Sequence, residues 1–493
     1  MNPVATERAP LRGSSSARRV LPEESTGRST SPLLRLRPPM LRRWWTDAAG
    51  LVVWATMLIV VALWEQHGGV QDLAAGGASA LNSIGRLSGL LSADLLLLQV
   101  LSMARVPFIE RSLGQDRLTR WHRWVGFTSI WLMVVHIVFI TVGYAQLDHW
   151  NVVSEAWSLI TTAPGMLLAT AGTALLVLVT VTSIRVARRK LRYESWHLLH
   201  LYAYLGAGLA LPHQLWTGTD FLASTWATVY WWSAYGLVMA LVLVYRVAVP
   251  LRLSAQQRLR VTSVQPAGPG AVTVAMHGPH LADLQVAAGQ FFVFRFMTGP
   301  GWTRPHPLSL SAAPTTHGLR VTMGVTGDDG ERIARMRPGT RVMIEGPYGR
   351  LHPLVRSRPQ LVLMGSGLGL APLVALAQEA VLAGRLTHGP ALMIRRLRSG
   401  VDAPMQADVD RLTAAGALQV VDLVGPRSRS GTAWLPQKHG HLPGTEAVRR
   451  LVPNLASADI YVCGTGPWVE AVADDLRSAG APKHAVHAEN FTW

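Results

Sequence analysis

Six long apolar stretches follow one another in the first half of this chain and limit what it can fold into. Each is close to the ~20 residues that cross a bilayer as a helix. The chain of 493 residues is 49% hydrophobic and only 15% charged, whereas a soluble protein carries about 25% charged residues. The sequence therefore predicts a membrane α-helical bundle of six spans. The predicted spans are residues 47–65, 84–105, 120–144, 165–185, 194–216 and 223–249.

The connections between these spans alternate in charge. Every second connection is rich in Arg, and the ones between contain no Lys or Arg. Because basic loops stay in the cytoplasm, we expect a multi-pass plasma membrane protein, in a bacterium the inner membrane, with both termini cytoplasmic. This topology accounts for much of the net charge of +17, so no nucleic-acid partner is expected. The loops without Lys or Arg are 66–83, 145–164 and 217–222.

The second half of the chain changes period. Short strand-like runs separated by Gly and Pro predict an antiparallel β-barrel, and the strands and helices that alternate after it predict an α/β domain with a parallel sheet. The single cysteine, Cys463, excludes an intramolecular disulfide and a four-cysteine iron–sulfur cluster. A cleaved transit peptide is the alternative to a disordered, basic cytoplasmic tail at the N-terminus. The predicted division is 1–43 tail, 44–252 bundle, 253–356 barrel and 357–493 α/β domain.

Four histidines lie inside two of the predicted spans. His122 and His136 are about 20 Å apart along one helix axis, and His200 and His213 are about 20 Å apart along the other. The two spans run in the same direction, so His122 can face His200 while His136 faces His213. Two stacked imidazole pairs are what two six-coordinate haems require. A bend at Pro212 would correct the unequal spacing, and the competing interpretation is that these histidines only hydrogen-bond neighbouring helices.

The string "HPLS", residues 306–309, ends a predicted barrel strand. A flavin needs a donor near its ring nitrogen N5, polar groups at its pyrophosphate and glycines that allow close approach. Ser309, His306 and Gly327 could supply these. The string alone could also be an ordinary turn.

Three glycines, Gly365, Gly367 and Gly369, lie between an apolar strand and a helix that has Pro372 near its start. Exposed amides and the helix dipole favour a pyrophosphate there, although the pattern departs from GxGxxG and a structural turn is the alternative. Cys463 ends another strand of the predicted sheet.

The neighbouring Gly464 and Cys463 would line the crevice at the carboxyl end of that strand, unless Cys463 is simply a buried small side chain. Arg395, Arg396 and Arg398 follow the strand "ALMI". They could bind the 2′-phosphate of NADPH, or they could be ordinary surface residues.

From about residue 84 to its C-terminus the chain resembles the ferric reductase and NADPH oxidase superfamily. "RLTRWHRWVG" and "ESWHLLHLYAY" look like its haem-carrying core, and "HPLSLSAAP", "GPYG", "GSGLGLAP", "CGTGPW" and "ENFTW" look like its ferredoxin-NADP reductase-type half. The resemblance implies two b-type haems on the four histidines, and an aromatic side chain, Phe491 or Trp493, over the flavin. It implies FAD at His306, Pro307, Leu308 and Ser309, and a nicotinamide nucleotide at Gly365, Gly367, Pro372, Cys463 and Gly464.

These features together predict an NAD(P)H-dependent flavohaem oxidoreductase. Electrons would leave NADPH or NADH through FAD and two haems for an extracytoplasmic acceptor, either dioxygen, giving superoxide, or a ferric complex. Ser309, Cys463 and Phe491 are expected at the reacting cofactors, and Arg120 and Arg123 at haem propionates. One alternative is a flavin reductase whose helices only anchor it, which predicts no haem spectrum. Another is a nucleotide-binding receptor, whose flavin NADPH cannot reduce. The family often has Thr where this chain has Gly330.

Overall fold

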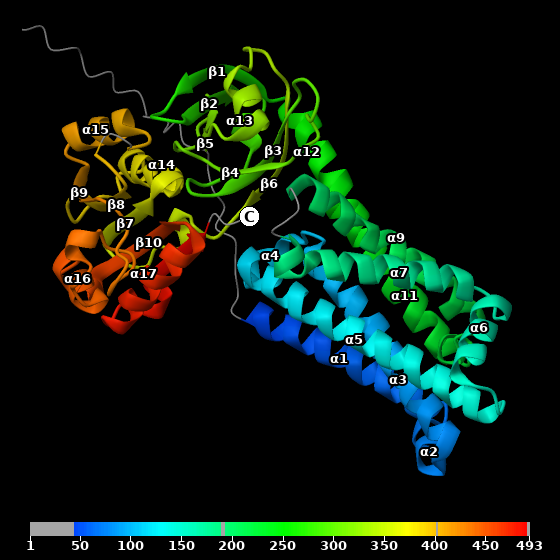
Figure 1. The fold of residues 1–493 in the computed structure, drawn as a ribbon. Coiled ribbons are helices and arrows are strands. Elements are labelled where there is room, and N and C mark those ends of the chain that lie inside the picture. Colours follow the sequence, from blue (N-terminus) through cyan, green and yellow to red (C-terminus); the bar gives the residue numbers. More distant parts are fainter. Residues whose placement is uncertain (1–43, 189–192, 401–402, 491–493) are drawn as a thin grey trace, which may run out of the picture.

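The structure is a computed structural model that describes residues 44–188, 193–400 and 403–490. An elongated helical bundle carries a globular half made of sheets at one of its ends (Figure 1). The predicted tail and the two C-terminal aromatic residues, Phe491 and Trp493, lie outside the described residues.

The bundle is built from long helices joined by short helical turns. Its helices are α1 (Trp44–Gln66), α2 (Gly69–Ala75), α3 (Gly77–Met103), α4 (Pro107–Leu113), α5 (Gln115–Leu147), α6 (Val152–Thr162), α7 (Met166–Ser183), α8 (Arg185–Arg188), α9 (Tyr193–Thr217), α10 (Thr219–Leu222), α11 (Thr225–Val242), the π-helical segment η1 (Leu243–Ala248) and α12 (Val249–Gln257).

Five helical segments of the described chain are long and apolar enough to cross a membrane. They are Asp47–Gln66, Gly77–Met103, Arg117–Leu147, Met166–Ser183 and Thr225–Gln257.

The helix α9 covers the predicted fifth span, 194–216, but is not among these five helical segments. Three histidines, Pro212 and Gln214 fall within it and lower its mean hydropathy. Five of the six predicted spans are therefore matched by helices long and apolar enough to cross a membrane, and the span at α9 stays a prediction.

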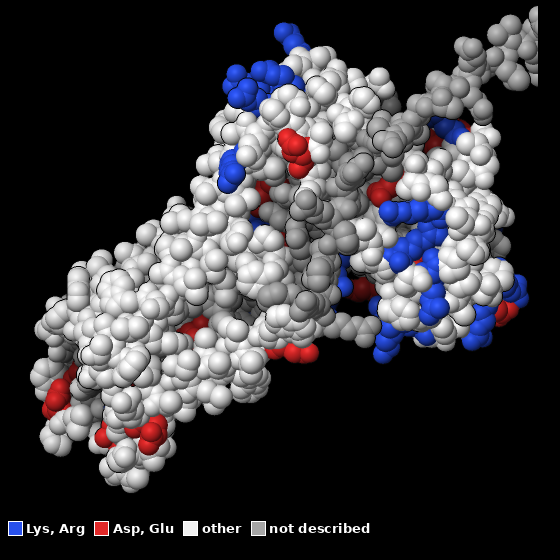
Figure 2. All heavy atoms as spheres, turned by 180° about the vertical axis from the view of Figure 1, so that it is seen from behind, with Lys and Arg blue, Asp and Glu red and all other residues white. Residues whose placement is uncertain are grey.

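Helices of the bundle pack closely in pairs, with α3 along α5 and α7 along α9. A Cβ atom on Gly172 of α7 would lie 2.5 Å from the carbonyl oxygen of Gly206 on α9, so these two backbones touch. The outer surface of the bundle carries exposed Leu, Val and Trp side chains. On the face shown in Figure 2 the bundle is almost free of Lys and Arg and carries only a few Asp and Glu, whereas Lys and Arg gather on the globular half. A lipid environment explains that distribution.

The first part of the globular half contains two three-stranded antiparallel sheets. Isolated bridges join Arg260 to Arg341 and Leu310 to Val321 between the sheets, and both sheets bury side chains such as Phe292 and Val274 in one core. In place of the predicted barrel, the structure thus has two sheets that are joined by isolated β-bridges. Their strand orders are β1 (Arg260–Pro266), β2 (Ala271–His277), β5 (Leu319–Gly324), and β4 (His306–Ser309), β3 (Phe291–Phe296), β6 (Val342–Tyr348), and the helix α13 (Gly327–Ala334) follows β5.

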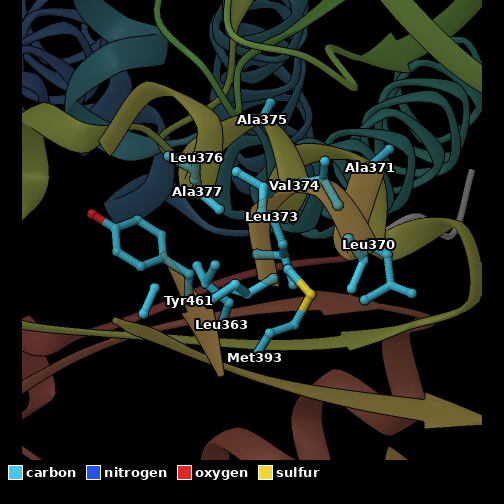
Figure 3. Packing of buried hydrophobic residues seen from close by; sticks show 14 of the residues in the cluster. Leu363, Leu370, Ala371, Leu373, Val374, Ala375, Leu376, Ala377, Met393 and Tyr461 are labelled. Atoms are coloured by element: carbon cyan, nitrogen blue, oxygen red, sulfur yellow. The ribbon is translucent and has the colours of Figure 1, made fainter. Parts of the chain in front are cut away.

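The last part of the chain is a five-stranded parallel sheet covered on both faces. Leu373 of α14 and Val409 of α15 belong to the core on one face, and Val448 of α16 and Val469 of α17 to the core on the other. Figure 3 shows α14 side chains against β7, β8 and β10. The strand order is β11 (Val486–Asn490), β10 (Ala458–Gly464), β7 (Gln360–Ser366), β8 (Ala391–Leu397), β9 (Leu418–Val424), with α14 (Leu370–Leu382), α15 (Gln406–Ala414), α16 (Gly444–Leu451) and α17 (Gly466–Ser478).

The order in which strands are added to this sheet reverses beside β7. The strands β8 and β9 are added on one side of β7, and β10 and β11 on the other. In sheets of this type the crevice at such a reversal, beyond the carboxyl ends of the strands, is where ligands bind. A nucleotide site is therefore expected at the loops that follow β7 and β10.

Candidate functional site

The four predicted histidines come together as two pairs between α5 and α9. The imidazole centroids of His122 and His200 lie 5.8 Å apart with an angle of 61° between the rings. The imidazole of His213 lies within electrostatic reach of His136. The nearby His197 lies one turn before His200 on α9. The structure therefore places these histidines near one another between α5 and α9, and their role as haem ligands stays a prediction.

Each of these four imidazoles is held through the same ring nitrogen, Nδ1. Three hydrogen bonds go to backbone carbonyls and one to a hydroxyl, and Nε2 has no hydrogen-bond partner among the described residues. The Nδ1 contacts are His122 to Gln99 O at 3.3 Å, His136 to Gly85 O at 2.8 Å, His213 to Ala210 O at 2.5 Å, and His200 to Ser183 Oγ at 3.2 Å.

This donor set fits a haem iron. A histidine that binds a metal through one ring nitrogen almost always donates the other N–H to a carbonyl or similar acceptor, which fixes its tautomer and its orientation. In the described part of the chain no three His, Cys, Asp or Glu side chains gather into a metal site. Iron held here would need a porphyrin to complete two protein ligands, as in a bis-histidine haem.

Gly89 on α3 leaves the space that the His136 ring fills. A Cβ atom on Gly89 would lie 2.5 Å from Nδ1 of His136 and 2.9 Å from its Cε1. The helix α3, which also supplies the carbonyl of Gly85, therefore fixes this imidazole from behind. Sequence reasoning missed Gly89, because its role depends on a contact between two helices.

The flavin motif lies on strand β4 and contains two buried polar atoms that form no hydrogen bond with the described residues. Ser309 Oγ and His306 Nε2 are buried and have no hydrogen-bond partner among the described residues. Burial is the main reason that the pKa of His306 is lowered, so this ring is neutral at pH 7. Unpaired buried polar atoms are uncommon in folded proteins, and they fit a ligand with acceptors for a hydroxyl and an imidazole.

The helix α13 begins at Gly327 close to this motif. Its Asp329 forms ion pairs with Arg304 at 2.8 Å and with Arg332 at 2.9 Å, which hold the helix to the loop before β4. A Cβ atom on Gly330 would lie 2.9 Å from the backbone of Val325. The departure from the family's Thr at Gly330 therefore suits the local packing, and this position offers no hydroxyl to a flavin phosphate.

The glycine turn after β7 contacts the end of β10, beside the crevice at the carboxyl ends of these two strands. A Cβ atom on Gly369 would lie 2.3 Å from the carbonyl oxygen of Cys463 and 2.7 Å from the nitrogen of Gly464. Only glycine permits this approach. Cys463 is fully buried, and Pro372 is the third residue of α14 and is also buried. The structure thus brings Gly365, Gly367, Gly369, Cys463 and Gly464 together.

Two of the three arginines considered for a 2′-phosphate are already occupied. Arg395 forms a two-pronged ion pair with Asp422, with both distances at 2.8 Å, and Arg396 donates to the carbonyl of Leu423 at 3.1 Å. Arg398 is exposed just beyond the end of β8. Of the three, only Arg398 therefore remains a candidate for binding an anionic group.

A buried ionic cluster joins the bundle to the sheets, and sequence reasoning did not find it. Glu345 on β6 is 3% exposed. It accepts hydrogen bonds from Arg246 of η1 at 3.1 Å and from the hydroxyl of Tyr348 at 3.0 Å, and Arg295 lies 3.6 Å away. Burial and the nearby Glu345 charge raise the pKa of the Tyr348 hydroxyl, so it remains a donor.

Another arginine, Arg105, extends the contact between the bundle and β6. The guanidinium of Arg105 lies 4.3 Å from the centre of the Tyr348 ring and pairs with Glu110 of α4 at 3.0 Å. On α12, Ser254 donates to the carbonyl of Ile344 and accepts from its amide. The end of the bundle that carries His122 and His200 is therefore locked onto β6.

The opposite end of the bundle carries another charged cluster. Arg86 on α3 donates to Asp220 at 2.8 Å and 2.7 Å and to Asp72 at 2.9 Å, and His67 bonds Asp220 at 3.2 Å. These contacts tie α2, α3 and α10 together. The cluster explains why an arginine is tolerated within a predicted span.

The membrane bundle and the C-terminal half match different groups of known proteins. Residues 88–211 match the family described as ferric reductase like transmembrane component. The chain is 27% identical over 212 residues to the 3-ketosteroid-9-alpha-monooxygenase, ferredoxin reductase component, of Mycolicibacterium smegmatis, which covers 42% of this chain and 56% of that protein. It is 28% identical over 215 residues to a flavohemoprotein of Xylella fastidiosa, covering 41% and 50%.

The chain thus spans about half the length of the curated relatives it matches. Among solved structures, the FAD/NAD-binding domain of nitric oxide dioxygenase from Vibrio cholerae is 21% identical, with a TM-score of 0.38, covering 48% of this chain and 99% of that chain. The chain thus combines a region similar to the ferric reductase like transmembrane component with a C-terminal half similar to ferredoxin reductase components and flavohemoproteins.

Proposed function

We propose that this protein is a membrane oxidoreductase that takes electrons from cytoplasmic NAD(P)H and delivers them across the bilayer, with FAD held in the globular half and two b-type haems held in the bundle. The observation that carries this proposal is the histidine quartet, in which every ring is anchored through Nδ1 and leaves Nε2 for a metal. Histidines that bind a metal almost always donate their other ring N–H to such a partner, and all four imidazoles share this arrangement.

The chain's own residues would hold these groups in a defined order. FAD, when bound, converts the electron pair of a hydride into single electrons, and a haem accepts one electron at a time. His122 and His200 would bind the haem nearer the globular half. His136 and His213 would bind the haem nearer the opposite surface. The carbonyls bonded to Nδ1 increase the basicity of the coordinating Nε2 atoms.

The globular half would bind FAD and the nucleotide on facing edges. Ser309 would donate to flavin N5 and His306 would contact the pyrophosphate, with Pro307, Leu308 and Gly327 completing that wall. The crevice at Gly365, Gly367, Gly369, Pro372, Cys463 and Gly464 would hold the nicotinamide nucleotide. Arg398 would bind a 2′-phosphate, which favours NADPH over NADH. Phe491 would cover the flavin ring.

In this proposal α9 also crosses the membrane, as the fifth of six spans, and both termini are cytoplasmic. The acceptor, dioxygen or a ferric complex, would then meet the haem at His136 and His213 from the outer side. The cluster of Arg86, Asp220 and Asp72 lies at the bundle end away from the globular half. Because its carboxylates are paired, it offers no open acidic surface for a bare metal cation.

Replacing His136 by Ala tests this function. We expect the variant to lose one of two haems and to stop delivering electrons to an external acceptor, while NADPH still reduces its flavin. His149→Ala is the matched control, because His149 is an exposed histidine just beyond the end of the same helix. Flavin reduction in both proteins shows that they are folded. Electron delivery at the wild-type rate by His136→Ala would contradict the proposal, and a protein without any haem would favour the anchored flavin reductase.

A further inference from the structure

A carboxyl group lies within a membrane span, buried among apolar side chains. Asp94 is on α3, in the apolar segment Gly77–Met103, and is 2% exposed. Its neighbours Leu90, Ala93 and Leu97 on the same helix belong to a buried hydrophobic cluster. An ionisable side chain at such a depth is costly and indicates a functional site by default. Neither the proposed haem sites nor the proposed nucleotide sites use this residue.

One oxygen of the Asp94 carboxyl group is bound and the other is open. Oδ1 accepts a hydrogen bond from the hydroxyl of Tyr230 on α11 at 3.2 Å. Oδ2 is buried and has no hydrogen-bond partner among the described residues. Thr56 of α1 lies beside the carboxyl group, but its hydroxyl donates to the carbonyl of Val53 at 3.0 Å. The structure therefore leaves Oδ2 as the position where a proton can bind.

An ionised Asp94 would have no counter-charge beside it. No Lys, Arg or His of the described residues forms an ion pair with it. The other charged residue of α3, Arg86, lies about 12 Å away along the helix axis and is already bound to Asp72 and Asp220. An unpaired carboxylate is disfavoured in an apolar interior, so its charge state responds to any charge that enters the bundle.

The helices packed against α3, which are α1, α2, α5 and α11, add few titratable groups at this depth. Ser92, two positions before Asp94, donates to a backbone carbonyl of α5, so Asp94 leaves α3 on a different side. The helix α11 contributes only Tyr230 and Tyr235, and Tyr235 donates to Gln214 of α9 at 2.7 Å. The titratable residues to consider on the other three helices are Asp47 and Glu65 at the ends of α1, Asp72 of α2, and Arg123 and His136, between which α5 has none.

Asp94 lies at a depth between the two histidine pairs. Five positions before it on α3, Gly89 approaches the ring of His136. Five positions after it, the carbonyl of Gln99 is hydrogen-bonded to His122. Each separation is about 7.5 Å along the helix axis. Because charges are weakly screened in a protein interior, a charge that arrives at either histidine pair acts on this carboxyl group.

We propose that Asp94 binds one proton at Oδ2 when an electron enters the bundle and releases it when the electron leaves. This inference rests on the proposed function, because it needs haems at the histidine pairs. The electron comes from NAD(P)H through FAD, and the proton comes from bulk water. An added negative charge favours the protonated form of a nearby carboxyl group, so the proton cancels the charge of the electron.

The cycle leaves the residue unchanged. When the electron passes to the external acceptor, the O–H bond at Oδ2 breaks and the proton returns to water. Tyr230 would be a positioning residue, because its hydroxyl holds Oδ1 and leaves Oδ2 for the proton. No further oxidant or reductant is needed.

The test uses the full-length protein with haem and flavin bound. Redox-difference infrared spectroscopy detects the C=O stretch of a protonated carboxyl group, which shifts in D₂O. We expect reduction to produce this band in the unaltered protein and in Asp148→Asn, which removes an exposed carboxyl group at the end of α5, but not in Asp94→Asn. The midpoint potential of the haems should fall as pH rises, because reduction takes up a proton, and this dependence should be flatter in Asp94→Asn.

Tyr230→Phe separates proton binding from a purely structural contact between α3 and α11. It removes the donor to Oδ1 and keeps the carboxyl group, so the infrared band should remain at a shifted frequency. An unchanged band and an unchanged pH dependence in Asp94→Asn would overturn the inference while both haems are still reduced. Should Asp94→Asn fail to retain its haems, Tyr230→Phe decides, and a band at the frequency of the unaltered protein would overturn the inference. An unaltered protein without haem would contradict the proposed function as well.

Discussion

Replacing Gly89 by Ala should displace His136, one of the proposed haem ligands, although none of the four histidines is itself substituted. The new Cβ atom would lie 2.5 Å from Nδ1 of His136, whereas ordinary contacts begin at 3.4 Å. The imidazole must therefore move by about 0.9 Å, the difference between these distances. It cannot move that far and keep its hydrogen bond of 2.8 Å to the carbonyl of Gly85.

The cost follows from two effects. Extra volume in a packed interior costs about 1–3 kcal/mol, and the lost hydrogen bond costs about 1 kcal/mol. Loss of a partner that orients a metal-binding histidine lowers metal affinity by about 10- to 100-fold. We therefore expect Gly89→Ala to fold and to bind the haem of His122 and His200 normally, but to bind the second haem 10- to 100-fold more weakly.

The assay is the haem content per polypeptide, from the pyridine haemochrome spectrum, together with electron paramagnetic resonance of the low-spin ferric signals. Two signals should become one in Gly89→Ala when haem is limiting. Gly208→Ala on α9 is the control, because a Cβ atom there meets nothing within 4 Å. Two intact signals with unchanged g-values in Gly89→Ala would refute the role given to His136 and its support from α3.

Three further outcomes can be measured on the same protein. Glu345→Gln removes the charge that pairs with Arg246; stopped-flow absorption should show haem reduction slowed at least tenfold with unchanged flavin reduction, and an equal slowing in Glu331→Gln, an exposed ion-pair control on α13, would contradict this. Ser309→Ala should keep FAD but slow flavin reduction by NADPH at least tenfold, whereas an unchanged rate would remove the hydroxyl from the mechanism. Burial opposes ionisation of Asp459, but hydrogen bonds from His487 and from backbone amides lower its pKa overall. Its ionised form therefore stabilises the fold above about pH 4, and this contribution is lost as pH falls. Asp459→Asn should lower the thermal midpoint at pH 7, and the difference should shrink in acid; a difference that is constant with pH would contradict the assignment.

The histidine quartet could be predicted because the membrane makes it conspicuous. An imidazole within an apolar span is costly and needs a reason, and the helical rise converts sequence spacing into depth. In the structure the rings of His122 and His200 lie 5.8 Å apart and His213 lies within electrostatic reach of His136, and the binding of haem by these four residues stays a prediction. The same polar residues explain why α9 falls outside the set of helices apolar enough to span a membrane.

Contacts between distant parts of the chain could not be predicted in this way. Glu345 and Arg246 are 99 positions apart, and no periodicity connects them. The pairing of the buried Arg395 with Asp422 depends on strand register, so the three neighbouring arginines considered for a 2′-phosphate could not be ranked from sequence. The short string at Ser309 became informative only when its hydroxyl was found buried and unpaired.

The most direct test of the proposed electron path is the absorption spectrum of the purified full-length protein before and after NADPH is added without oxygen. With ample porphyrin supplied during expression, we expect a Soret band from two low-spin haems per polypeptide. Adding NADPH should bleach the flavin band and bring up the reduced haem bands together. A protein that binds flavin but shows no Soret band, or whose haems stay oxidised while its flavin is reduced, would contradict the proposed path.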